Sequence, residues 1–307
     1  MFHSACAQSP GAAARIGYLD ANSTPGWFEA FQRGLQELGY VENRNIVIEK
    51  RSAEGRAERL PALAAELVRL SPRVIVVSTP PAALAARTAT ATIPIVVANA
   101  TDLEGLGLVQ SLAHPGGNVT GLSNLQTGVM GKRLELLAEL VPGISHIRVV
   151  WEPGVQGPEF AFRELKAAAA TSRFTLEPFE VKRPEDIGPA FAAFGAPVGA
   201  GIVLNGPITV RYRAAVAAAA AQGKLPSIFY DIEFVRAGGL LSYGPNIPEL
   251  HRRAAVYVDK ILKGAKPSDL PVEQANVFDL VVNLRAAKAL GIAIPQSILV
   301  RADEVIE

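Results

Sequence analysis

Short apolar runs alternate with amphipathic segments along most of the chain. The run Val74-Ile-Val-Val is apolar at every position, which is typical of a strand in a parallel sheet covered on both faces. The segment that follows residue 27 instead has one apolar face, formed at helical spacing by Phe28, Phe31, Leu35 and Leu38. Strands that alternate with helices of about 10–15 residues predict right-handed βαβ units and a parallel sheet.

This order of elements occurs twice. The first set predicts strands at 15–20, 45–49, 74–77 and 95–97, and helices at 28–38, at 57–70 and from residue 80. The second set predicts strands at 146–151, 174–181, 200–204 and 226–230, and helices at 159–171, 185–194 and 210–222. The fold class is therefore α/β, with two Rossmann-like lobes that each hold a parallel sheet.

The remaining elements indicate that the chain crosses between the lobes more than once. They comprise helices at 132–141, 249–262 and 285–290 and strands at 271–274 and 278–283. The C-terminal part is too small for a third domain, so it must pack on the lobes. We expect a hinge of three crossings, near 121–125, 242–247 and 275–283. Lobe one is then 15–122 with about 246–275, and lobe two is 123–245 with about 276–307.

Composition and charge narrow the class of protein. Hydrophobic residues make up 49% of the 307 residues and charged residues 19%, which fits a folded globular chain. The net charge is +1, from 30 basic and 29 acidic residues without a basic block, which argues against a nucleic-acid surface. No apolar run reaches the roughly 18 residues that would span a bilayer. We expect a monomer that binds a small solute.

Residues 1–14 form a separate tail. Ser4-Ala5-Cys6-Ala7 has the small residues that precede a signal-peptide cleavage site, which predicts export to the periplasm. The alternative is a disordered tail. A lipid anchor at Cys6 is a weaker possibility, because His3 stands where an aliphatic residue is expected. Cys6 is the single cysteine, so no internal disulfide can form.

Catalytic and cofactor motifs are missing from the sequence. The histidines His3, His114, His146 and His251 have no metal-ligand spacing, and we expect His251 to lie on a solvated helix face beside Arg252 and Arg253. Neither a phosphate-binding loop nor a nucleophile elbow occurs. We therefore expect no catalytic residue, no metal and no cofactor, and an enzyme of the doubly wound class is the least favoured interpretation.

Polar residues gather where the predicted strands end. Ligands of open parallel sheets bind outside the carboxyl ends of the strands, where helix N-termini present free N–H groups. In lobe one the candidate ligand-binding residues are Asn22, Ser23, Ser78, Thr79, Asn99, Thr101 and Asp102. In lobe two they are Trp151, Glu152, Asn205, Tyr230 and Asp231.

Each candidate has a ligand role and a structural alternative. Ser78 and Thr79 are placed to hold a carboxylate, Asp102 or Asp231 to meet an ammonium, and Trp151 and Tyr230 to flank an apolar or aromatic group. The alternative for Ser78, Thr79 and Asp102 is helix capping, worth about 1 kcal/mol each. The alternative for Trp151 and Tyr230 is packing, and for Asn22 and Ser23 a turn.

Several longer stretches carry a family pattern. The first half has Gly39-Tyr-Val-Glu-Asn-Arg-Asn-Ile-Val-Ile-Glu, Leu60-Pro-Ala-Leu-Ala-Ala-Glu-Leu and Pro115-Gly-Gly-Asn-Val-Thr-Gly. The second half has Lys132-Arg-Leu-Glu-Leu-Leu, Gly238-Gly-Leu-Leu-Ser-Tyr-Gly-Pro-Asn and Ala302-Asp-Glu-Val-Ile-Glu. From about residue 15 onward the chain resembles ABC-transporter substrate-binding proteins, in the group with tryptophan and aromatic amino-acid binding members. The resemblance implies a type I periplasmic-binding fold and delivery of a small solute to a membrane permease.

Two departures from that pattern lie among the candidate residues. Trp151-Glu152-Pro153 stands where many members have Trp-Asn-Pro, and Asn205-Gly206-Pro207 stands where an Asp-Pro pair is frequent. Glu152 therefore adds a carboxylate that either favours a cationic or ammonium-bearing ligand or points to solvent. The function predicted is binding of an amino-acid-like or carboxylate solute for an ABC importer, with a ligand-sensing module as the alternative.

Overall fold

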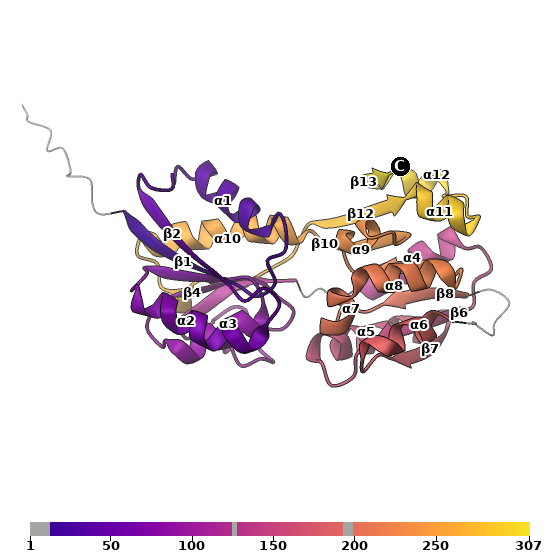
Figure 1. Cartoon of the computed structure of the whole chain (residues 1–307), viewed down its shortest axis with the longest axis horizontal. Helices are drawn as coiled ribbons and strands as arrows, with labels where there is room; N and C mark the ends of the chain where they lie inside the picture. Colours follow the sequence, from indigo (N-terminus) through magenta and orange to yellow (C-terminus); the bar gives the residue numbers. More distant parts are fainter. Residues whose placement is uncertain (1–12, 125–127, 193–198) are drawn as a thin grey trace, which may run out of the picture. The chain divides into compact units, whose positions relative to one another are not determined.

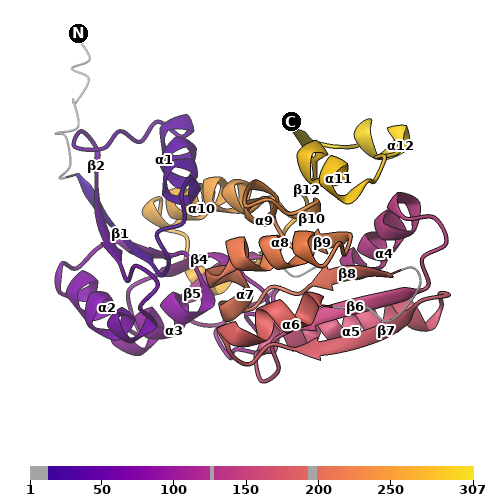
Figure 2. The same ribbon diagram turned by 45° about the vertical axis from the view of Figure 1, so that its right-hand side comes forward.

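The computed structural model describes residues 13–124, 128–192 and 199–307, which fold into two compact units. Unit 1 comprises 1–125 and 247–275, and unit 2 comprises 126–246 and 276–307. The chain thus passes between the units three times, after residues 125, 246 and 275. Figures 1 and 2 show the elements of each unit from two directions.

Unit 1 contains a six-stranded sheet in which every strand pair is parallel. Its order is β11-β5-β4-β3-β1-β2. The strands are β1 (Ala14–Asp20), β2 (Ile46–Ser52), β3 (Val74–Val77), β4 (Ile95–Ala100), β5 (Val119–Ser123) and β11 (Glu273–Gln274). All four residues of β3 are buried, as the continuous apolar run predicts.

Helices cover both faces of this sheet. They are α1 (Trp27–Glu37), α2 (Leu60–Arg69), α3 (Pro80–Ala89) and α10 (Ile247–Leu262). One face carries α2 and α3, and the other carries α1 and α10 (Figure 2). Gly34 lets α1 approach α10 closely, because a Cβ atom there would lie 2.2 Å from the carbonyl oxygen of Arg252. The two short 3₁₀ turns are η1 (Ala57–Arg59) and η3 (Pro267–Asp269).

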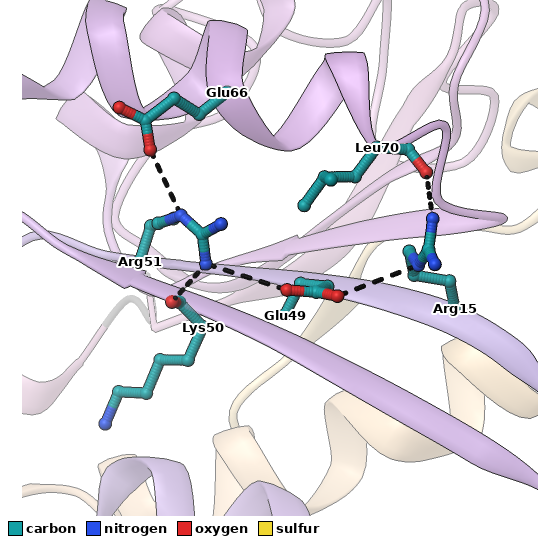
Figure 3. A network of polar contacts seen from close by, with 6 residues as sticks. All are labelled: Arg15, Glu49, Lys50, Arg51, Glu66 and Leu70. Atoms are coloured by element: carbon teal, nitrogen blue, oxygen red, sulfur yellow. Dashed lines mark hydrogen bonds and ion pairs between the residues drawn. The ribbon is translucent and has the colours of Figure 1, made fainter.

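Strand β2 forms one edge of the unit 1 sheet, and charged side chains line it (Figure 3). Glu49 forms ion pairs with Arg15 at 3.7 Å and with Arg51 at 3.7 Å. Arg51 also pairs with Glu66 of α2 at 3.1 Å, and Arg15 donates to the carbonyl oxygen of Leu70. Partly exposed pairs of this kind contribute little stability. Charges along an edge strand do oppose pairing with another sheet.

Unit 2 contains a seven-stranded sheet with the order β13-β12-β10-β9-β8-β6-β7. The strands are β6 (His146–Trp151), β7 (Thr175–Glu180), β8 (Gly199–Val203), β9 (Ser227–Phe229), β10 (Leu241–Pro245), β12 (Phe278–Asn283) and β13 (Glu304–Ile306). All strand pairs are parallel except β10 with β12, which are antiparallel.

The helices of unit 2 pack around two apolar clusters. They are α4 (Val129–Leu140), α5 (Gln156–Ala170), α6 (Ile187–Phe191), α7 (Pro207–Arg211), α8 (Arg213–Gln222), α9 (Ile232–Arg236), α11 (Leu284–Leu290) and α12 (Gln296–Leu299), with the 3₁₀ turn η2 (Pro184–Asp186). One cluster joins α4 and α5 to the sheet, and the other joins α6, α8 and α9 to it.

The internal repeat is confirmed by strand order. Strands β5-β4-β3-β1-β2 of unit 1 correspond in sequence order to β10-β9-β8-β6-β7 of unit 2. The helix that follows β5 is α4 and packs in unit 2, whereas the helix that follows β10 is α10 and packs in unit 1. The two copies therefore exchange the helix that follows their fifth strand.

The sequence prediction was wrong in several details. The segment 210–222 is two helices, α7 and α8, that meet at Tyr212. The predicted strand 271–274 is reduced to β11, since the carbonyl oxygen of Pro271 accepts from the Tyr257 hydroxyl and the N–H of Val272 donates to the carbonyl oxygen of Leu112. The predicted α/β fold with parallel sheets is confirmed, and the one antiparallel pair in unit 2 arises where β12 enters from the C-terminal segment and runs against β10. No helix in the described ranges is both long and apolar enough to cross a membrane.

Candidate functional site

The ends of β1 and β3 in unit 1 are joined by Ser78. Its hydroxyl donates to Asp20 Oδ1 at 3.2 Å and accepts from the backbone N–H of Ala21 at 3.0 Å. Asp20 Oδ1 also accepts from the N–H of Asn22 at 3.2 Å. Ser78 is buried, so its hydroxyl has an internal role that sets the path of the loop after β1.

Thr79 stands at the N-cap position of α3 and has an unpartnered hydroxyl. The residue is 8% exposed, and its buried Oγ1 has no hydrogen-bond partner among residues 13–124, 128–192 and 199–307. The first two helical residues are Pro80 and Pro81, which have no N–H to offer it. A buried hydroxyl without a partner costs roughly 1–3 kcal/mol. Thr79 is thus available to a group that is not part of unit 1.

The other unit 1 candidates are mostly engaged in loop structure. Asn99 Oδ1 accepts from Asn124 Nδ2 at 2.5 Å, and the carbonyl oxygen of Thr101 accepts from the Ser123 hydroxyl at 3.1 Å. Asp102 Oδ1 accepts from the N–H of Gly105 at 2.8 Å, as the capping alternative predicts.

Asn22 and Ser23 lie on the exposed loop between β1 and α1. Ser23 has a left-handed backbone, with φ of 53°, and its hydroxyl lies 2.5 Å from that of Ser52. Left-handed φ values are typical of turns. The turn geometry leaves the Asn22 side chain facing solvent.

In unit 2, Glu152 occupies the N-terminus of α7. Its carboxylate is 3% exposed and accepts from the N–H groups of Ile208 at 3.0 Å and Thr209 at 2.7 Å. Gly206 makes room for it, because a Cβ atom there would lie 2.4 Å from Glu152 Cδ. The carboxylate therefore does not point to solvent. It caps a helix of its own chain.

Two further unit 2 candidates have buried polar atoms without a partner. Within the part of the chain that the structure describes, Asn205 Oδ1 and Trp151 Nε1 have no hydrogen-bond partner. The Trp151 ring packs against Phe162 of α5, with ring centroids 4.7 Å apart. Packing therefore accounts for the ring of Trp151 but not for its N–H, which normally finds an acceptor when buried.

Tyr230 and Asp231 connect β9 to α9. Asp231 Oδ1 caps α9 by accepting from the N–H of Glu233 at 2.9 Å. Burial raises the pKa of the Asp231 carboxyl to about 6, and the charge of Glu233 adds to that rise. Burial likewise raises the pKa of the Tyr230 hydroxyl, so the phenol is neutral near pH 7.

Two buried polar residues lie outside the set of predicted ligand-binding residues. Arg133 of α4 is fully buried in unit 2, and His251 of α10 is fully buried in unit 1. The expectation of a solvated His251 was wrong, because its ring stacks on Trp27 at 4.9 Å and its Nδ1 lies 3.0 Å from the Tyr18 hydroxyl. The available signal was helical spacing, since His251 lines up with the buried residues Ala254, Ala255 and Val258.

No group of three or more His, Cys, Asp or Glu residues within the described ranges is arranged to hold a metal ion. The strand ends offer hydroxyl, amide, carboxylate and aromatic groups instead, some of them unpartnered. These groups suit recognition of a small polar solute by hydrogen bonds.

Fold and strand-end chemistry together define a two-unit α/β solute-binding protein. The family described as ABC transporter substrate binding protein matches residues 18–306. The chain belongs to this family, which confirms the resemblance seen in the sequence and identifies a binding protein rather than an enzyme.

Individual relatives bind aromatic amino acids or have the same fold. A tyrosine-binding protein from Clostridioides difficile (strain R20291) is 26% identical over 262 residues, which cover 85% of this chain and 75% of that protein. An ABC domain from Streptococcus pneumoniae in complex with L-Trp is 29% identical, covers 96% of this chain and 100% of its own, and has a TM-score of 0.86. A conserved domain protein from Vibrio cholerae is 31% identical, covers 95% and 99% of the two chains, and has a TM-score of 0.85.

Proposed function

We propose that this protein is the solute-binding component of an ABC importer and that its ligand is an amino acid, with aromatic side chains favoured over branched ones. The relatives support this class, since one is named for tyrosine and another was solved with L-Trp. The family also supports an exported protein that delivers its solute to a permease in the inner membrane. We expect it to act in the periplasm as a monomer.

One observation carries the proposal. Five buried side-chain polar atoms of the described residues have no hydrogen-bond partner, and three of them belong to candidate residues at strand ends: Thr79 Oγ1, Trp151 Nε1 and Asn205 Oδ1. Buried polar atoms are normally paired, so such atoms need an explanation. A ligand that supplies the missing partners provides one.

The roles follow from the chemistry of each group. Thr79, with Ser78 behind it, receives the ligand carboxylate at the start of α3, where the helix dipole favours negative charge. Asp231 receives the ammonium, because it is the strand-end carboxylate in unit 2 that retains acceptor capacity next to an aromatic ring. Trp151 and Tyr230 contact the ligand side chain. Ligand contacts from both units then favour a closed state over an open one.

Calorimetric titration with the twenty amino acids tests the proposal. We expect heat and a rise in melting temperature with L-tryptophan, L-tyrosine or L-phenylalanine, and weaker effects with L-leucine and L-isoleucine. A ligand at 100 times its dissociation constant stabilises the bound state by about 2.7 kcal/mol. A folded protein that binds none of the twenty amino acids would overturn the assignment.

A further inference from the structure

The guanidinium of Arg133 is buried, and no carboxylate of the described residues forms an ion pair with it. Its Nε donates to the carbonyl oxygen of Tyr243 at 2.8 Å, its Nη2 to that of Tyr230 at 3.4 Å, and its Nη1 meets Met130 Sδ at 3.8 Å. Burial lowers the pKa of Arg133 to about 10, so the group is still charged at neutral pH. An unpaired buried charge costs several kcal/mol. The fold therefore retains Arg133 against a substantial penalty.

The partners of Arg133 are the residues that shape one candidate loop. Tyr230 directly follows β9 and precedes Asp231, the N-cap residue of α9. Tyr243 lies in the neighbouring strand β10. The guanidinium carbon lies 5.4 Å from the centroid of the Tyr230 ring, within range of a cation–π interaction. Arg133 thus contacts both the backbone and the ring of the residue assigned to the ligand side chain.

Gly244 allows this arrangement. A Cβ atom at Gly244 would lie 1.8 Å from the carbonyl oxygen of Tyr230 and 3.5 Å from Arg133 Nη2. Strand β10 therefore passes directly against the Tyr230 carbonyl that Arg133 binds. The loop is fixed from two sides, by a glycine in the strand and by a cation from the helix.

Unit 1 has a neutral residue at the corresponding place. Helices α4 and α10 follow the fifth strand of their respective copies, and Arg133 and His251 are each the fifth residue of their helix. Both are fully buried, but burial lowers the pKa of His251 to about 3, so that imidazole is neutral at pH 7. A buried residue at this position of the helix therefore need not be charged. The charge of Arg133 must be explained by its contacts within unit 2.

The loop after β9 provides that explanation. Arg133 donates to the carbonyl oxygen of Tyr230 and lies over the Tyr230 ring, and Tyr230 directly precedes Asp231. The Asp231 carboxyl itself is influenced by Glu233 of α9, which disfavours its ionised form, and by Arg213 of α8, which favours it. Arg133 therefore acts on Asp231 through the backbone of the loop.

We propose that Arg133 is a positioning residue of the ligand site: its guanidinium fixes the Tyr230–Asp231 loop and so holds the Asp231 carboxylate in place as the acceptor for a ligand ammonium. This proposal deepens the proposed function and rests on it for the ligand. Arg133 itself is too buried to touch the solute. It acts through the two residues above it.

The test compares Arg133→Lys and Arg133→Met with a matched control. Lys keeps the charge but not the fork of donors, and Met keeps neither. Arg148→Met is the control, because Arg148 is also a largely buried arginine of unit 2, with Ala190 and Glu177 as partners away from the loop. Melting temperature is measured for all three, so that loss of folding is recognised.

The first readout uses the ligand-free protein. Amide hydrogen exchange at 230–236 should accelerate at least tenfold in both Arg133 variants and remain unchanged in Arg148→Met. Wild-type exchange in folded Arg133→Met would overturn the proposal.

The second readout uses L-tryptophan and indole-3-propionate, which lacks the ammonium group. Arg133→Met and Arg133→Lys should each weaken L-tryptophan binding about tenfold more than indole-3-propionate binding. Equal losses for the two ligands would overturn the role of Arg133 in positioning Asp231. Absence of binding by wild type would contradict the proposed function alone, because the ligand-free readout still tests the role of Arg133 in the loop.

Discussion

The helices that follow the third strand of each repeat begin in different ways. In unit 1, the N-cap residue of α3 is Thr79, whose buried hydroxyl has no partner among the described residues. In unit 2, α7 begins at Gly206, and the carboxylate of Glu152 accepts from two N–H groups of its first turn. Both helices have proline at their first position. One copy keeps its helix N-terminus available, and the other fills it with a carboxylate of its own.

Under the proposed function, this difference predicts how the ligand is oriented. Carboxylates and helix N-termini attract each other. Because Glu152 already satisfies the N-terminus of α7, we expect the ligand carboxylate at the start of α3. The departure of Trp151-Glu152-Pro153 from the family pattern is thereby explained as helix capping rather than as contact with a cation.

Removal of the Glu152 carboxylate should have the largest effect. Glu152→Ala leaves two N–H groups at the start of α7 without acceptors and opens a cavity beside buried Thr209. We expect a loss of about 3 kcal/mol in the free energy of unfolding of unit 2. Urea denaturation followed by far-UV circular dichroism measures it. A loss below about 0.5 kcal/mol would show that α7 does not depend on this cap.

Gly206→Ala should cost less, about 2 kcal/mol, because the added methyl group displaces the Glu152 carboxylate. The double variant with Glu152→Ala sharpens the comparison. Once the carboxylate is gone, Gly206→Ala should cost under about 0.5 kcal/mol, which gives a coupling energy of more than 1 kcal/mol. The control is Gly188→Ala in α6, where a Cβ atom meets nothing within 4 Å. Additive effects would mean that Gly206 and Glu152 are independent.

The buried residues of α4 and α10 should respond differently to pH. The pKa of His251 is about 3 in the folded chain and about 6.5 when unfolded, so the folded state binds fewer protons between these values. Stability should therefore fall as pH falls from 6.5 towards 3, by up to about 1.4 kcal/mol per pH unit. Arg133 stays protonated in both states over this range and adds no such slope. Denaturation of wild type and His251→Gln at pH 7, 6, 5 and 4 measures the difference, and equal slopes would exclude His251 as its source.

Thr79→Ala should have the smallest effect on stability. Removal of Oγ1 relieves the cost of an unpaired hydroxyl, but the same substitution also loses the packing of the buried γ-methyl group, so we expect a net change within about 0.5 kcal/mol. Thr79→Ser is the matched control that keeps the hydroxyl. Thermal denaturation of the ligand-free variants checks this expectation. A loss of 1 kcal/mol or more in Thr79→Ala but not in Thr79→Ser would mean that the hydroxyl is bound within unit 1 and is not available to a ligand.

The sequence predicted the elements whose apolar pattern is local. Strands 74–77 and 146–151 have the observed bounds, because their apolar residues are consecutive or alternate cleanly. The antiparallel direction of β12 was not predictable, since strand direction depends on a connection from a distant segment rather than on the pattern of the strand.

The positions of the candidate residues at the strand ends were predictable, but their side-chain contacts were not. Strand-end positions follow from topology, and all twelve candidates lie in or beside the loops that follow the strands. That Glu152 reaches α7, or that Arg133 lies beneath Tyr230, depends on contacts between segments 56 and 97 residues apart in sequence. The burial of Arg133 was not predictable from the apolar stripe of α4, because a long cationic side chain next to leucines is ordinarily assigned to the surface.

The most direct measurement is calorimetric titration of wild type and Thr79→Ala with L-tryptophan and with tryptamine, which lacks the carboxylate. We expect wild type to bind L-tryptophan at least 100-fold more tightly than tryptamine, and Thr79→Ala to reduce that ratio by about tenfold, because one charge-assisted hydrogen bond contributes roughly 1.5–3 kcal/mol. An unchanged ratio in a folded Thr79→Ala variant, or equal binding of the two ligands by wild type, would contradict the assignment of the ligand carboxylate to unit 1.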